Sequence, residues 1–204
     1  MKQAVIFDID DTLLHLANED DSLYRQAIGR VLGTVRYRSC LADYNYVTDS
    51  GILTELLSDN GVEANPKIIT AIKDELLAAT EKYVFEFGPF KEVPGARGLL
   101  SRLRNSERYA VAIATGGWRQ TAQFKLATAG FDLEGVPLST SDDAIDRVEI
   151  MQLALESLGE DLESITYYGD GPWDELACQE LGWSFRAVGV MLRGIQSYEN
   201  EFVA

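Results

Sequence analysis

The segment Asp8-Ile9-Asp10 places two carboxylates directly after an apolar run at residues 4–7. Side chains alternate along an extended chain, so Asp8 and Asp10 point to the same side if the strand geometry continues. Two converging carboxylates repel each other unless a cation or a shared proton relieves them. Mg²⁺ prefers oxygen ligands and is usually held through one or two carboxylates, so the segment indicates a magnesium site, with a solvated acidic turn as the alternative.

Two further segments carry groups that bind anions or metal ions. Thr115-Gly116-Gly117 follows another apolar run and offers a hydroxyl and glycine N–H groups that can cradle an anion. Asp170 and Asp174 add two carboxylates after a third run. Taken alone, each segment also fits an ordinary turn at the start of a helix. Together they favour one site, because ligands bind outside the carboxyl ends of parallel strands.

The elements expected to position these groups are buried strands alternating with helices. Short apolar runs, mostly β-branched or aromatic, predict strands at residues 4–7, 111–114, 165–168 and 185–188. Helical patterns that end at a glycine predict helices at residues 118–129 and 148–158. This alternation predicts an α/β fold with a Rossmann-like, doubly wound parallel sheet.

Residues 17–92 interrupt that alternation. They contain amphipathic patterns and no convincing strand, and they predict helices at residues 22–32, from Thr48-Asp49 to Gly61, and from Asn65-Pro66 to about Phe87. We therefore predict an all-helical cap at residues 17–92, inserted into an α/β core of residues 1–16 and 93–204.

The composition restricts the partners. Of 204 residues, 46% are apolar and 25% charged, as in soluble globular proteins, and the net charge is -15. Nucleic acids and anionic membranes bind clustered Lys and Arg, so neither is expected as a partner. Neither a signal peptide nor a transmembrane stretch is predicted. Cys40 and Cys178 have no metal-ligand spacing and form no disulfide framework, so a reducing, cytoplasmic setting is expected.

The order of the segments, Asp-x-Asp-x-Thr, then Thr-Gly, then Gly-Asp-x-x-x-Asp, resembles the phosphatase branch of the haloacid dehalogenase superfamily. The resemblance covers the whole chain, including the helical insertion and the segment Val93-Pro94-Gly95-Ala96 that leads back to the core. It implies a magnesium-dependent hydrolase of a small phosphorylated metabolite. Asp10 favours phosphoester chemistry, because the dehalogenases of the superfamily need no protonated oxygen leaving group and lack this second Asp.

The resemblance also implies a role for each motif residue. Asp8 is the expected nucleophile, which forms an aspartyl-phosphate, and Asp10 is the expected general acid and base. Thr115 and the N–H of Gly116 are expected to bind the phosphoryl oxygens. The substrate itself and the oligomeric state are not predicted.

The implied magnesium site consists of the carboxylates of Asp8 and Asp170 and the backbone carbonyl of Asp10. Asp174 is expected either to join this site or to orient it. The superfamily also places a Lys between the second and third segments, to hold the nucleophile and the phosphate. In this chain the aligned residue is Arg147.

Arg147 keeps the positive charge of the family Lys, but its planar fork is not equivalent to an ammonium group. The alternatives are that Arg147 is a surface residue at the start of a helix, or that Lys125 takes the role as a weaker substitute. His15 stands where an acidic residue is familiar and is expected to be structural. Thr48-Asp49 resembles a cap motif of some family members, which implies that it faces the active site; the alternative is a plain helix N-cap, and the N-cap is favoured.

Three other functions stay open at this point. A phosphotransferase or mutase would use the same aspartyl-phosphate and exclude water until a second hydroxyl arrives. A regulatory or binding protein would keep the fold with little catalysis, and the replacement at Arg147 is the feature that favours it. A phosphorylatable signalling receiver fits less well, because of the large helical insertion.

Overall fold

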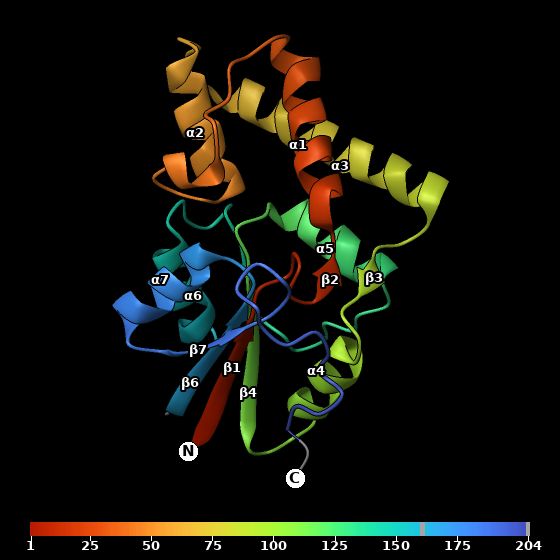
Figure 1. The fold of residues 1–204 in the computed structure, drawn as a ribbon, viewed down its shortest axis with the longest axis vertical. Helices are drawn as coiled ribbons and strands as arrows, with labels where there is room; N and C mark the ends of the chain where they lie inside the picture. The colour runs from red at the N-terminus through yellow and green to blue at the C-terminus, as the bar shows by residue number, and fades with distance from the viewer. Residues whose placement is uncertain (160–161, 203–204) are drawn as a thin grey trace.

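The computed structural model describes residues 1–159 and 162–202 and shows an α/β core with a helical layer above it (Figure 1). The core sheet has the strand order β5-β4-β1-β6-β7, and all neighbouring strands are parallel. Its strands are β1 (Lys2–Phe7), β4 (Tyr109–Ala114), β5 (Leu138–Ser139), β6 (Leu162–Gly169) and β7 (Ser184–Ala187). The predicted α/β fold with a parallel sheet is confirmed.

Helices cover both faces of this sheet. On β1, Val5 and Phe7 belong to one buried cluster and Ile6 to another, because successive side chains point to opposite faces. The first face is covered by α4 (Ala96–Arg104) and α5 (Arg119–Thr128), and the second by α6 (Arg147–Glu156) and α7 (Pro172–Leu181). β1 therefore lies in the middle of the core, and its carboxyl end is held between β4 and β6.

Three helices are inserted between the short strands β2 (Leu14–His15) and β3 (Lys91–Glu92), which pair antiparallel. They are α1 (Ala17–Leu32), α2 (Asp49–Asp59) and α3 (Pro66–Phe87), with a 3-10 turn at Leu41–Asp43. Figure 1 shows them together above the end of the sheet where β1 and β4 finish. The inserted helical region is confirmed, while the boundaries drawn for core and cap stay predictions. Residues 160–161 and 203–204, assigned to the core, lie outside the described residues.

The local signals for the two later cap helices hold. The side chain of Thr48 accepts a hydrogen bond from the N–H of Gly51 at 3.1 Å, and that of Asn65 accepts one from the N–H of Ile68 at 3.1 Å. Both are N-caps that satisfy a backbone donor in the first turn of the helix. Pro66 follows at the first helical position, where its missing N–H costs nothing.

The predicted secondary structure was wrong at the start of α1 and at three short strands. α1 begins at Ala17 rather than at residue 22, because the expected range followed the apolar face and left out the acidic first turn with Glu19 and Asp20. β2, β3 and β5 were missed, and β3 lies in the stretch expected to have no strand. Each has two residues, which is too short for an alternating pattern.

Two expectations about the chain as a whole can be compared with the structure. Cys40 is exposed and Cys178 is buried, and both are free cysteines. Within the described residues, none of the helices combines the length and apolar character that crossing a membrane requires.

Candidate active site

A tight turn after β1 carries the first pair of acids. The N–H of Asp8 donates to the carbonyl of Tyr168 on β6 at 2.9 Å, which extends the sheet by one residue. The chain then reverses through Asp11, whose φ is 52°, and the Asp11 carboxylate accepts a hydrogen bond from the N–H of Leu16 at 3.0 Å. The turn keeps Asp8 and Asp10 at the strand end while the chain leaves for the cap.

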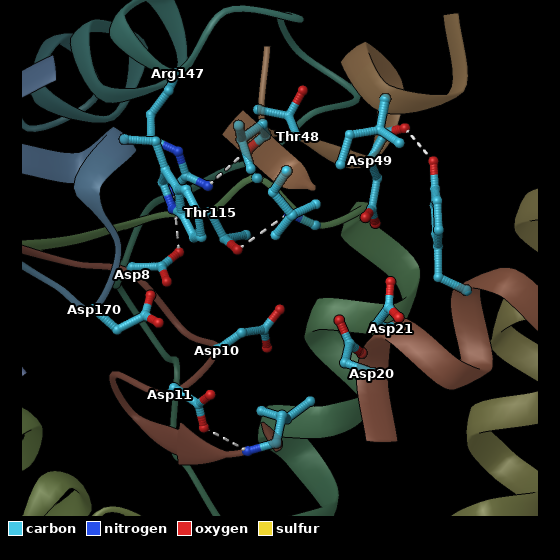
Figure 2. A pocket seen from close by; sticks show the side chains of 18 of the residues that line it. Asp8, Asp10, Asp11, Asp20, Asp21, Thr48, Asp49, Thr115, Arg147 and Asp170 are labelled. Atoms are coloured by element: carbon cyan, nitrogen blue, oxygen red, sulfur yellow. Dashed lines mark hydrogen bonds and ion pairs between the residues drawn. The ribbon is translucent and has the colours of Figure 1, made fainter. Parts of the chain in front are cut away.

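A cavity of about 230 Å³ lies between this strand end and the cap. Figure 2 shows side chains from both parts of the chain around it. The core contributes Asp8, Asp10, Asp11, Thr115, Gly116, Gly117, Arg147, Asp170, Trp173 and Met191. The insertion and its entry contribute Leu16, Asp20, Asp21, Tyr24, Leu41, Val47, Thr48, Asp49 and Ile52. The three sequence segments are therefore brought together at one cavity.

Three carboxylates form one group beside this cavity. Oxygen atoms of Asp8, Asp170 and Asp174 all lie within 4.8 Å of one another. Burial, followed by the charge of Asp174, raises the pKa of Asp8 well above its ordinary value and that of Asp170 to about 7. Such a set of mutually repelling oxygen donors fits a hard divalent cation, because the cation relieves the repulsion.

Arg147 is the first residue of α6, and its guanidinium reaches the same group. Nη1 lies 2.9 Å from Oδ1 of Asp174 and 3.4 Å from Oδ1 of Asp8. Nη2 donates to the backbone carbonyl of Val47 in the cap at 3.2 Å. The side chain is 11% exposed, so Arg147 is not the surface residue of the alternative interpretation.

Gly116 allows this placement of Arg147. A Cβ atom on Gly116 would lie 2.5 Å from Nη2 of Arg147 and 3.2 Å from the carbonyl oxygen of Val47. Real Cβ atoms do not approach other atoms so closely, so a side chain here would displace the guanidinium or the cap loop. The glycine thus provides the space that the guanidinium of Arg147 and the carbonyl of Val47 occupy.

Lys125, on α5, contacts Asp10. As a substitute for the family Lys, it was expected beside the nucleophile Asp8. Its Nζ lies 2.7 Å from Oδ1 of Asp10 and 3.1 Å from Oδ1 of Asp20 on α1, and the residue is 2% exposed. Burial raises the pKa of Asp10, Lys125 lowers it, and the resulting pKa is about 6. Lys125 thus pairs with Asp10 and with Asp20 of the cap, whereas Arg147 pairs with Asp8 and Asp174.

The cap segment at Thr48-Asp49 does more than begin α2, so the favoured plain N-cap was incomplete. Thr48 caps the helix and also donates through its hydroxyl to the carbonyl of Ile145 in the core at 2.8 Å. The Asp49 carboxylate accepts from the N–H of Trp118 at 2.9 Å, and the Asp49 N–H donates to the carbonyl of Gly116 at 2.8 Å. Both residues line the cavity.

The model of the haloacid dehalogenase-like hydrolases matches residues 2–182 of this chain. The chain belongs to this family. It is therefore a haloacid dehalogenase-like hydrolase, and the sequence resemblance is confirmed. No curated protein shows significant sequence similarity to this hydrolase.

Solved structures similar to this hydrolase share its fold at low sequence identity. A hydrolase from Pseudomonas syringae has a TM-score of 0.70 and 20% identity, over 91% of this chain and 84% of the other. CbbY from Rhodobacter sphaeroides, as a mutant in complex with xylulose-(1,5)bisphosphate, has a TM-score of 0.68 and 16% identity over 100% and 92%. A β-phosphoglucomutase from Clostridium difficile has a TM-score of 0.69 and 14% identity over 98% and 87%.

Several residues at the cavity of this hydrolase were missed in the sequence. Asp20 and Asp21 lie in the first turns of α1, which the expected helix did not include. Their acidic run before an apolar face was a usable signal, because acids are favoured at helix N-termini. Tyr24 looked like part of that apolar face, and its hydroxyl donates to the carbonyl of Asp49 at 2.7 Å. Lys125 was named only as a substitute for the family Lys, and its contacts with Asp10 and Asp20 had no signal in the sequence.

Proposed function

We propose that this hydrolase is a magnesium-dependent phosphatase that cleaves a small phosphorylated metabolite through an aspartyl-phosphate on Asp8. The observation that supports it most is the position of Asp8, which is 3% exposed and lines the cavity. Nη1 of Arg147 lies 3.4 Å from its carboxylate, and oxygen atoms of Asp170 and Asp174 lie within 4.8 Å of it. A nucleophilic carboxylate needs such neighbours, because it must approach a phosphate that carries the same sign of charge.

The expected metal ligands fit Mg²⁺ by the chemistry of their donors. Asp8 and Asp170 offer carboxylate oxygens and Asp10 its backbone carbonyl, all of them hard ligands. Asp174 accepts from Arg147 and from the N–H of Gly171 at 3.1 Å, so it is better suited to orienting the site than to binding the ion. A bound Mg²⁺ would favour the ionised carboxylates and offset the charge of the phosphate.

Asp8 and Asp10 divide the chemistry between them. The carboxylate of Asp8 attacks phosphorus in line, so that a bond from phosphorus to Asp8 forms as the bond to the leaving oxygen breaks. Asp10 gives its proton to that leaving oxygen. Asp10 then takes a proton from the water that attacks the aspartyl-phosphate, and inorganic phosphate leaves. A pKa of about 6 suits both steps, because each protonation state of Asp10 is accessible near neutral pH.

The transferring phosphoryl oxygens are expected to meet Thr115, Gly116 and Arg147. The Thr115 oxygen accepts a hydrogen bond from the N–H of Gly117 at 3.2 Å, which leaves its hydroxyl hydrogen able to donate to a phosphate. Arg147 adds positive charge at the same end of the cavity. Fixed donors of this kind act mainly on the charge that develops in the transition state.

Phosphate release from a panel of small phosphate esters, with and without Mg²⁺, tests this function. We expect magnesium-dependent release that falls at least about a thousandfold in Asp8→Asn. Circular dichroism of the variant should match the wild type, because Asn keeps the shape of the side chain. Comparable turnover in Asp8→Asn would remove Asp8 as the nucleophile.

The same panel separates hydrolysis from phosphotransfer. A phosphotransferase or mutase, such as the β-phosphoglucomutase that shares this fold, would pass the phosphoryl group to a second hydroxyl. Free phosphate in a stoichiometric amount supports the phosphatase. A phosphorylated acceptor with little free phosphate would favour the transferase.

A further inference from the structure

The cavity has one end for the transferring phosphate and another, under the cap, for the rest of the substrate. We propose that the second end accepts a small leaving group that is neutral or cationic and rich in O–H or N–H donors, and rejects one that carries a second phosphate or a carboxylate. This inference rests on the proposed phosphatase function and names its substrate class.

The positive charge at the cavity is confined to the phosphate end. Among the described residues that line it, Arg147 is the single Lys or Arg, and its Nη1 is already within 3.4 Å of Asp8 and 2.9 Å of Asp174. The nearby ammonium of Lys125 is 2% exposed and contacts Asp10 and Asp20. Among the described residues at the cavity, no side-chain cation is therefore left over for a second anionic group of the substrate, and the proposed Mg²⁺ would be held at the phosphate end.

The cap end instead presents acids. Asp20, Asp21 and Asp49 all line the cavity, and Figure 2 shows them on the side away from Asp8 and Asp170. Lys125 compensates Asp20, and Arg25 lies 2.7 Å from Asp21 on its exposed side. Asp49 has one main-chain donor, the N–H of Trp118. These carboxyl groups can accept hydrogen bonds from hydroxyl or ammonium groups of a ligand, whereas a second anion would meet the like charge of Asp20 and Asp21.

Apolar side chains fill the remaining wall and limit the size of the leaving group. Tyr24, Leu41 and Ile52 line the cavity from the cap, and Trp173 and Met191 from the core. With about 230 Å³ to hold the phosphate as well, the space suits a leaving group of a few carbon atoms. The bisphosphate held by CbbY belongs to that protein, and a shared fold at 16% identity does not carry its ligand to this chain.

Three two-carbon phosphate esters of nearly equal size form a charge ladder that tests the proposal. They are 2-aminoethyl phosphate, 2-hydroxyethyl phosphate and phosphoglycolate, whose leaving groups are cationic, neutral and anionic. With wild-type protein and Mg²⁺, we expect kcat/KM for phosphoglycolate to be lower than for the neutral ester by about tenfold or more. The cationic ester should be at least as good as the neutral one.

Binding to Asp8→Asn by titration calorimetry reads the same preference without turnover. The order of Kd in the presence of Mg²⁺ should follow the ladder, with phosphoglycolate weakest. This arm also removes differences in the intrinsic reactivity of the three leaving groups. If none of the esters is hydrolysed by the wild type, the proposed function fails, and the order of Kd still decides the present inference.

Charge variants show whether the cap acids set the preference. Asp21→Asn removes one acid from the cavity lining, so the discrimination against phosphoglycolate should shrink about threefold or more. Asp74→Asn removes the same charge from an exposed position on α3 outside the cavity and should leave the ratio unchanged. Phosphoglycolate binding or reacting as well as the neutral ester would overturn the proposal, as would equal effects of the two variants.

Discussion

Two buried cations join the core to the cap, and they do so differently. Arg147 contacts the carboxylates of Asp8 and Asp174 and reaches the cap through the backbone carbonyl of Val47. Lys125 reaches the cap through a second carboxylate, that of Asp20. The first link therefore depends on the path of the cap backbone, and the second on the charge of one cap side chain.

The two links therefore affect different acids of the site: Arg147 contacts Asp8, and Lys125 contacts Asp10. At Arg147, the cap side chains can vary freely as long as the carbonyl stays in place. At Lys125, the expected acid and base Asp10 shares its cation with the cap, so moving α1 changes the charge that Asp10 experiences. We infer that the nucleophile is largely independent of cap sequence, while Asp10 depends on it.

Loss of the Arg147 side chain should have the largest effect. Arg147→Ala leaves Asp8 without its nearest cation and removes charge from the phosphate end, so phosphate release should fall by about a thousandfold. Arg147→Lys should stay within about tenfold of the wild type, because it keeps the charge but loses the second contact of the fork. Steady-state kinetics would check both, and full activity in the Ala variant would exclude Arg147 from the site.

Loss of the Lys125 charge should mainly reduce stability. Lys125→Met keeps most of the side-chain volume but leaves Asp10 and Asp20 without a cation, which should lower the free energy of unfolding by about 3 kcal/mol at neutral pH. Urea denaturation would measure this. Adding Asp20→Asn to Lys125→Met should recover part of the loss, and a double variant no more stable than the single one would contradict the three-group link.

A methyl group on Gly116 should disturb the Arg147 link from the other side. Because its Cβ would lie 2.5 Å from Nη2 of Arg147, Gly116→Ala should reduce activity by roughly tenfold to a hundredfold. Gly29→Ala is the matched control, since nothing lies within 4 Å of a Cβ at that position in α1. The control should keep full activity and gain a little helix stability. Equal activity of both variants would argue against the predicted clash.

A further expected effect concerns pH and the cap contact at Asp49. Burial, followed by the charge of Asp20, raises the pKa of Asp49 to about 8. The folded state therefore binds the Asp49 proton more tightly than the unfolded state does. The contribution of this proton to the free energy of unfolding is fully present at acid pH and is lost as pH rises from about 4 to 8. Asp49→Asn should flatten the dependence of unfolding free energy on pH there, by up to about 1.4 kcal/mol per pH unit. An unchanged slope in urea titrations would rule out Asp49 as its source.

The sequence carried the core of the site because its motifs follow buried strands. Strand ends can be recognised from apolar runs, and parallel topology brings those ends together, so Asp8, Thr115 and Asp170 could be expected at one place. Arg147 could be expected there from its position in the family pattern. The same reasoning fixed the alternation of strands and helices and the helical insertion.

The link through Lys125 could not be predicted in the same way. A lysine in the helical pattern of α5 is ordinarily solvated, and nothing nearby in sequence marks it as 2% exposed. Its partners lie on the first motif turn and on α1, so the pairing depends on how the cap rests on the core. Asp49 was recognised as part of a helix start, but its hydrogen bond to Trp118 depends on that same packing.

The short pairing of β2 with β3 has a consequence for how this protein could be rebuilt. Leu14 pairs with Glu92 and His15 with Lys91, so the chain leaves for the insertion and returns from it at neighbouring points, one strand spacing of about 4.8 Å apart. A hairpin turn of a few residues spans such a gap. The two ends of the helical insertion are therefore close together in space. Another helical segment whose ends are equally close could replace it without a longer connection at β2 or at β3.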